Sequence, residues 1–116
     1  MQYKRSLRVA GFLKKEISDI LMREVKDPAI KMVTITKITV TDDLKIAKVY
    51  VNMIGPKELR NDMMHGLERA KKFIRSEIGH RADLKYIPEL FFYYDDTADY
   101  VESIDSLIKK IHMEDK

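Results

Sequence analysis

The chain has 116 residues, of which 45% are hydrophobic and 35% are charged, and its formal net charge is +3. This composition is typical of one globular domain, so we expect a single domain over residues 1–116 with fraying at 1–5 and 112–116. The absence of cysteine excludes a disulfide scaffold and a thiolate metal site, and the lack of a secretory signal or a ~20-residue apolar stretch predicts a cytoplasmic protein.

The first half of the chain predicts one helix and two strands. Apolar residues recur at helical spacing from about Leu7 to Val25, and Pro28 is expected to stop this helix. Residues 32–41 and 46–54 are rich in β-branched residues and flank an Asp-Asp turn, which predicts an antiparallel hairpin. In the second strand the alternate residues Lys48, Tyr50 and Asn52 are expected to face solvent.

The second half predicts a helix, a strand and a final helix. The helix begins near Lys57, and Gly79 is placed to end it because glycine accepts the left-handed cap. A strand at Glu89–Tyr94 follows, and Asp96 or Thr97 can cap a last helix that continues to Ile111. The order α-β-β-α-β-α indicates an α+β fold with helices on one face of a three-stranded sheet.

Basic residues gather in two places along the chain. The first group is Lys4, Arg5, Arg8, Lys14 and Lys15, and the second is Arg69, Lys71, Lys72, Arg75, Arg81 and Lys85. In contrast, residues 86–108 contain six carboxylates and neither lysine nor arginine. This separation predicts an orienting field with a cationic side suited to a polyanion such as nucleic acid. The alternative is that both groups are ordinary solvated helix faces.

The aromatic run Phe91–Tyr94 allows two interpretations. Nucleic-acid bases can stack on aromatic side chains that are exposed on a strand. No basic residue is interleaved with this run, however. We therefore interpret it as a short central strand that is buried on both faces.

The remaining polar residues do not form a recognisable catalytic or metal site. Asp95 and Asp96, with Asp99 and Glu102, lack the calcium-loop pattern and are suited to capping. The histidines have no metal-ligand spacing, the serines lie in no nucleophile elbow, and no glycine-rich phosphate loop is present. We therefore expect no catalytic activity, no metal, no cofactor and no small-molecule substrate, and nothing in the sequence requires more than a monomer.

Several motifs occur together at characteristic spacing. They are Arg8-Val9-Ala10, the series from Glu16 to Pro28, Ala47–Val51, Phe73-Ile74-Arg75, and Pro88-Glu89-Leu90 followed by Phe92 and Asp95. From about Arg5 to Tyr100 the chain thereby resembles the ribosome-binding factor A family. The resemblance implies a KH-like fold of type II, in the order α-β-β-α-(kink)-α-β, and the C-terminal helix expected from Asp96 or Thr97 onward would follow it.

The resemblance also implies a special geometry in the second helix. In this family a helix–kink–helix built on Ala-x-Gly replaces the RNA-contacting GxxG loop of ordinary KH domains. Ala70 matches this pattern, but Lys72 stands in place of the glycine. Lysine is a much better helix former than glycine, so we expect a helix that is straighter here or kinked less sharply, with one more positive charge.

The function implied by the resemblance is that of a bacterial assembly factor. Such a factor binds the free small ribosomal subunit, assists late maturation of its ribosomal RNA near the 5′ end, matters for growth in the cold, and is not a nuclease. The residues expected to contact RNA are Arg5, Arg8, Arg69, Lys71, Lys72, Arg75, Arg81 and Lys85. Two alternatives remain open: an adaptor that uses its acidic C-terminal helix on a basic protein, and a metal-dependent RNA-processing enzyme using Asp95 and Asp96.

Overall fold

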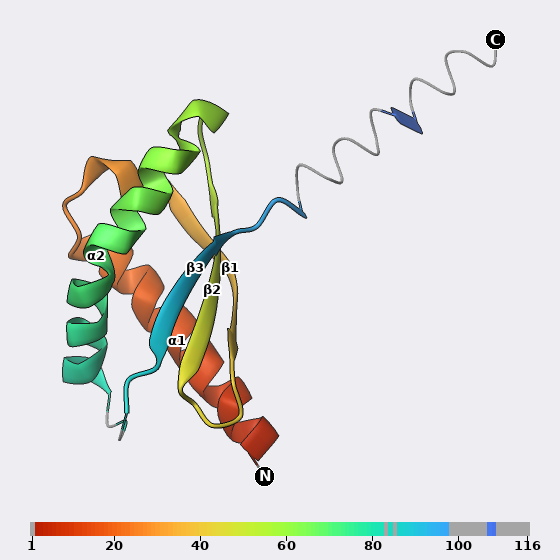
Figure 1. The fold of residues 1–116 in the computed structure, drawn as a ribbon. Helices are drawn as coiled ribbons and strands as arrows, with labels where there is room; N and C mark the ends of the chain where they lie inside the picture. The colour runs from red at the N-terminus through yellow and green to blue at the C-terminus, as the bar shows by residue number, and fades with distance from the viewer. Residues whose placement is uncertain (1, 83, 85, 98–106, 109–116) are drawn as a thin grey trace.

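The computed structural model describes residues 2–82, 84, 86–97 and 107–108, and its elements confirm the predicted α+β class (Figure 1). They are helix α1 (Gln2–Arg23), the short 3-10 helix η1 (Pro28–Ile30), strands β1 (Val33–Val40) and β2 (Ile46–Met53), the 3-10 helix η2 (Lys57–Leu59), helix α2 (Arg60–Arg81) and strand β3 (Glu89–Tyr94). The predicted C-terminal helix falls almost entirely outside the described residues.

The three strands form one mixed sheet in the order β1-β2-β3. β1 and β2 pair antiparallel as the predicted hairpin, with a register shift between Ile35 and Lys37 that leaves Thr36 in a bulge. β3 pairs parallel to β2, because the chain returns through α2 in a crossover connection. β3 is therefore an edge strand, and Tyr93 on it is exposed, so the prediction that the aromatic run lies in a central strand buried on both faces is wrong.

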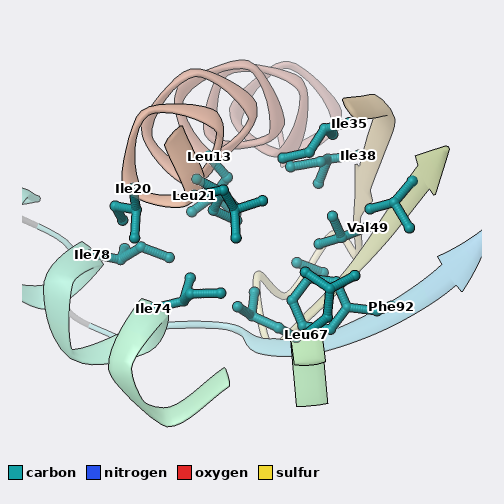
Figure 2. Close-up of a cluster of buried hydrophobic side chains, with 14 of the residues drawn as sticks. Leu13, Ile20, Leu21, Ile35, Ile38, Val49, Leu67, Ile74, Ile78 and Phe92 are labelled. Carbon is teal, nitrogen blue, oxygen red and sulfur yellow. The ribbon is translucent and has the colours of Figure 1, made fainter. Parts of the chain in front are cut away.

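Both helices lie on the same side of the sheet, as predicted (Figure 1). Figure 2 shows their apolar side chains meeting those of the sheet in one core. The core residues with no exposed surface include Leu13, Ile17 and Ile20 from α1, Met63, Leu67, Ile74 and Ile78 from α2, and Ala47, Val49, Val51 and Leu90 from the sheet. The other face of the sheet has no helix against it in the described part of the chain.

The helix boundaries differ from the predicted ones in two places. α1 begins at Gln2, five residues before the predicted start, and ends at Arg23. α2 continues past Gly79 to Arg81, so the prediction that Gly79 ends this helix is wrong. Its last turn ends instead at Ala82, which is extended and whose N–H donates a hydrogen bond to the carbonyl of Ile78. The helix continues beyond Gly79 because carboxylates in α1 and directly after it hold the side chain of Arg81.

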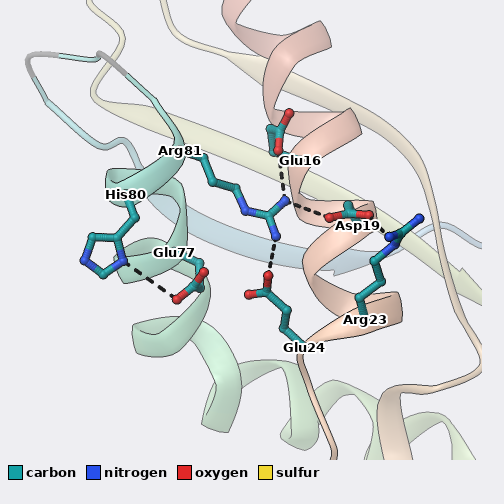
Figure 3. A network of polar contacts seen from close by, with 7 residues as sticks. All are labelled: Glu16, Asp19, Arg23, Glu24, Glu77, His80 and Arg81. Carbon is teal, nitrogen blue, oxygen red and sulfur yellow. Dashed lines mark hydrogen bonds and ion pairs between the residues drawn. The ribbon is translucent and has the colours of Figure 1, made fainter.

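Arg81 joins the end of α2 to α1 through three carboxylates (Figure 3). Its Nη1 donates to Glu16 Oε2 at 2.9 Å and to Asp19 Oδ2 at 2.8 Å, and its Nη2 donates to Glu24 Oε1. The Arg81 side chain is 21% exposed. The hydrogen bonds that Arg81 donates to Asp19, Glu16 and Glu24 raise its pKa above the ordinary value, so the guanidinium stays charged at all working pH values.

The region of the family kink is an unbroken helix in this chain. α2 is continuous through Ala70 and Lys72, yet Figure 1 shows its axis changing direction near the middle. Buried residues lie on both sides of this point, for example Met63 before it and Ile78 after it. Both halves of the helix therefore contribute to the core, although lysine and not glycine stands at residue 72.

Gly66 lies where α2 approaches η1 most closely. A Cβ atom at this position would lie 2.8 Å from Cγ2 of Ile30, a contact too short for carbon atoms. Ile30 is 1% exposed and cannot turn away into solvent. Gly11 in α1, in contrast, has no atom within 4 Å of the corresponding position. Glycine is therefore required sterically at residue 66 and not at residue 11.

The end of β3 is fastened to the other two strands by Asp95. The Thr36 hydroxyl in the bulge donates to Asp95 Oδ2 at 2.7 Å, and the Asp95 N–H donates to the Val51 carbonyl at 2.7 Å. The N–H of Thr97 donates to Asp95 Oδ1 at 3.0 Å. Hydrogen bonds from Thr97 and Thr36 lower the pKa of Asp95 to about 2.

We expect Gly66→Ala to lower the free energy of unfolding by about 1–2 kcal/mol, because overpacking costs more than the gain in helix propensity. The matched change Gly11→Ala should raise it by about 0.5–1 kcal/mol. Urea denaturation of both variants measures the difference. Equal effects of the two changes would contradict the close approach of α2 to η1.

We expect Arg81→Ala to lower the urea midpoint far more than Arg23→Ala does. Removal of Arg81 leaves Glu16, Asp19 and Glu24 close together without their shared cation, and uncompensated charge is strongly destabilising. Arg23 is the matched control because it pairs with Asp19 at 2.8 Å while its own side chain is 73% exposed. Similar midpoints for the two variants would contradict the structural role of Arg81.

The depressed pKa of Asp95 predicts a pH-dependent contribution to stability. A carboxyl whose pKa is about 2 when folded and 3.8 in its ordinary state stabilises the fold above pH 3.8, and this contribution disappears as the pH falls through 2. We therefore expect Asp95→Asn to be less stable than the parent at neutral pH, with the difference shrinking in acid. Urea titrations at several pH values measure it, with the exposed Asp96→Asn as the control. A difference in unfolding free energy between parent and Asp95→Asn that stays constant from pH 7 to about 2 would contradict the prediction.

Candidate nucleic-acid interface

The eight predicted RNA-contacting residues lie on both helices. Arg5 and Arg8 belong to α1, and Arg81 is the last residue of α2. Four more follow one another within α2, namely Arg69, Lys71, Lys72 and Arg75. Lys85 lies outside the described residues. The structure assigns structural contacts to several of these side chains.

Arg69 stabilises the turn that precedes η1. Its Nη2 donates to Asp27 Oδ2 at 2.8 Å, while the N–H of Ala29 donates to Asp27 Oδ1 at 3.0 Å. Both hydrogen bonds lower the pKa of Asp27, the arginine contributing more. The Arg69 side chain remains 62% exposed, so a phosphate could approach it only in competition with Asp27.

Lys71 and Arg75 both turn toward β3. Lys71 Nζ lies 2.9 Å from Glu68 Oε2 and 5.6 Å from the centre of the Phe91 ring, and its side chain is 25% exposed. Arg75 donates to the carbonyls of Ile87 and Pro88, at 3.0 and 3.2 Å. Lys72, in contrast, is exposed and forms no such contact with the described residues. Lys71 and Arg75 are therefore engaged within the fold, because Lys71 pairs with Glu68 beside Phe91 and Arg75 holds the segment that leads into β3.

Three of the eight residues carry positive charges that are not paired with any described residue. Arg5, Arg8 and Lys72 are exposed, and within the described ranges they form neither a hydrogen bond nor an ion pair. Arg5 and Arg8 line a shallow depression of about 280 Å³ together with Val9, Phe12 and Leu84. The fold thus brings the start of α1 beside the loop that follows α2. Arg81, in contrast, already forms ion pairs with three carboxylates.

Sequence reasoning missed a second group of cationic and aromatic side chains on the open face of the sheet. Lys37 of β1, Tyr50 of β2 and Tyr93 of β3 are register partners. The available signal was the alternation of Lys48, Tyr50 and Asn52, which predicted a solvated face of β2. The strand order was required to place Tyr93 beside this face.

The acidic residues in the described ranges lack the arrangement of a metal site. No group of three histidine or carboxylate side chains lies close enough there to hold a metal ion. Asp95, which an RNA-processing enzyme would have used, accepts hydrogen bonds from Thr36 and Thr97. Among the described residues, no helix has the length and hydrophobicity that a membrane span requires.

Comparison with known proteins identifies relatives along nearly the whole chain. The family model described as ribosome-binding factor A matches residues 5–108. The ribosome-binding factor A of Syntrophobacter fumaroxidans is 45% identical over 114 residues, which cover 97% of each chain. That of Halothermothrix orenii is 43% identical over 116 residues, covering 100% of this chain and 95% of its own.

Solved structures agree with these relatives at the level of the fold. The crystal structure of ribosome-binding factor A from Thermus thermophilus has a TM-score of 0.68 at 19% identity and covers 77% of this chain and 93% of its own. A Thermus thermophilus ribosome-binding factor A fitted into a cryo-EM map of a 30S complex has a TM-score of 0.62 at 20% identity, with coverage of 74% and 90%. The fold is therefore KH-like, and the chain belongs to the ribosome-binding factor A family.

Proposed function

We propose that this protein binds the free small ribosomal subunit and assists late maturation of the small-subunit ribosomal RNA near its 5′ end. It acts by binding RNA and not by catalysis. The observation that carries the proposal is family membership over nearly the whole chain. The 30S complex of the Thermus thermophilus protein, which shares this fold, supports the choice of subunit.

The binding surface that we propose uses the exposed cations of the two helices. Arg5 and Arg8 flank an apolar depression at the start of α1, and Lys72 is an exposed residue of α2. These side chains can neutralise phosphates without breaking an ion pair of the described residues. Arg69, Lys71, Arg75 and Arg81 contribute mainly by holding the two helices, the η1 turn and β3 in position.

The physical consequence of such contacts is a salt-dependent affinity. Each phosphate that a lysine or arginine neutralises releases a counterion, so log affinity falls with log salt by about 0.7–0.9 per contact. Backbone contacts of this kind fix the register and orientation of the protein on the RNA and do not read its sequence. We propose a cytoplasmic monomer whose role is to stabilise one conformation of the maturing RNA, a role that matters most in the cold, when misfolded RNA rearranges slowly.

We expect the purified chain to co-sediment with isolated small subunits and not with large subunits. Association should weaken as the salt concentration rises. The double change Arg8→Glu and Lys72→Glu should reduce the salt slope by about 0.7–0.9 per lost contact and weaken binding at least tenfold. The matched control is Lys57→Glu, an exposed lysine of η2, which should bind like the parent.

The outcomes of this experiment separate the competing functions. Equal binding to both subunits would indicate that the protein is a general cationic RNA binder. No binding to either subunit would overturn the proposal. A larger loss on reversing Asp99, Glu102 and Asp105 than on reversing Arg8 and Lys72 would favour the protein–protein adaptor. Metal-dependent cleavage of RNA by the purified chain would favour an enzyme.

A further inference from the structure

The sheet presents a row of side chains that the proposed helical surface does not use. Lys37, Tyr50 and Tyr93 are register partners across all three strands. The neighbouring row contains Thr39, Lys48 and Phe91. Because side chains alternate along strands, both rows lie on the face opposite the core. α1 and α2 lie on the core side (Figure 1), so no described helix covers these rows.

The two tyrosines form a stacked pair at the surface. Their ring centres are 5.5 Å apart, and the ring planes differ by 29°. Tyr93 remains 42% exposed on the edge strand. Lys37 Nζ lies 4.7 Å from the centre of the Tyr50 ring, on the β1 side of the pair. One end of the row is thus cationic, and the other end is an accessible aromatic ring.

The charges around this pair have a definite arrangement. Lys37 and Lys48 are both exposed, and they are diagonal neighbours on β1 and β2. Carboxylates stand at the two ends of β3, where Glu89 is its first residue and Asp95, which also interacts electrostatically with Lys37, follows Tyr94. A polyanion on this face is therefore attracted to β1 and β2 and repelled from the ends of β3.

We propose that this face of the sheet is a second RNA contact, which stacks one unpaired base on Tyr93 while Lys37 and Lys48 hold the adjoining phosphates. Aromatic side chains stack on any base, and lysines beside them track the backbone, which is how sequence-tolerant binders hold single strands. The arrangement selects an unpaired nucleotide, because a base inside a duplex cannot present its face to a tyrosine. The inference rests on the proposed function in that the RNA is that of the small subunit.

A cross-strand tyrosine pair also stabilises a sheet, and a purely structural role must be distinguished from binding. The experiment therefore uses a short, labelled, single-stranded oligoadenylate and measures fluorescence anisotropy. Tyr93→Ala should weaken binding about tenfold or more, whereas Tyr93→Phe, which keeps the ring, should bind like the parent. Tyr93→Leu keeps apolar bulk over Tyr50 without an aromatic face, and it should lose binding while remaining folded.

Two further variants locate the contact on the sheet. Phe73→Ala is the matched control, because Phe73 of α2 is 43% exposed, close to the 42% of Tyr93, and belongs to the helical side. It should leave oligoadenylate binding unchanged. Lys37→Gln should lower the salt slope by about 0.7, the value for one phosphate of a single strand. In NMR titrations the ring protons of Tyr93 should shift upfield as the oligoadenylate binds.

Each outcome bears on this contact separately from the small-subunit proposal. Equal binding by the parent, Tyr93→Ala and Tyr93→Leu would overturn the contact, even if the parent co-sediments with small subunits. Tyr93-dependent binding of oligoadenylate without co-sedimentation would overturn the proposed function and retain the contact. If a ribosomal protein and not RNA shifted the Tyr93 ring-proton signals, the proposed RNA contact would also be overturned, because the face would then be a protein-docking surface.

Discussion

The burial of two amphipathic helices against a single face of the sheet is the constraint on which the other features depend. Leu13 of α1 and Ile74 of α2 reach the same core, and Val49 of the central strand lies beneath them. Within the residues that the structure describes, the helices cover one face of the three-stranded sheet and leave the other face open (Figure 1). The protein consequently has two surfaces of different chemistry, a helical one with exposed cations and a pleated one with a tyrosine pair.

The basic residues of the chain divide between structure and surface charge. Arg81 bridges α2 to two carboxylates of α1 and to Glu24, which follows that helix. Arg69 orders the turn before η1, and Arg75 holds the segment that leads into β3. A cation that is already hydrogen-bonded gains less from a phosphate, because it must give up or share its partner. Arg5, Arg8 and Lys72 have no such partner among the described residues, which explains why the proposed helical contact is narrower than the basic sequence alone suggests.

The two proposed contacts are complementary in their physical character. Lysine and arginine on the helices attract RNA phosphates electrostatically, and this attraction weakens as the salt concentration rises and does not depend on the RNA sequence. The Tyr50–Tyr93 pair supplies stacking, which requires an unpaired base and depends less on salt. Used together, they would favour RNA in which a duplex or a folded backbone lies beside a single-stranded segment, as in an incompletely matured ribosomal RNA.

The sequence by itself determined the elements whose signals are local. Periodic apolar residues predicted both helices, alternation predicted the β1–β2 hairpin, and β3 was predicted with the bounds that the structure has. The motifs from Arg8 to Asp95 identified the family, which the comparisons confirm. These features depend on residues close together in the chain, so one sequence is enough to find them.

Only the tertiary structure decided where β3 lies and which charges are engaged. The crossover through α2 makes β3 an edge strand, so Tyr93 meets Tyr50, a residue 43 positions earlier, on an open face. Arg81 extends α2 beyond Gly79 because its partners, Glu16 and Asp19 of α1 and the adjoining Glu24, lie more than fifty positions away in the chain. Such contacts join side chains that no local pattern brings together, and they depend on how the helices cross the sheet.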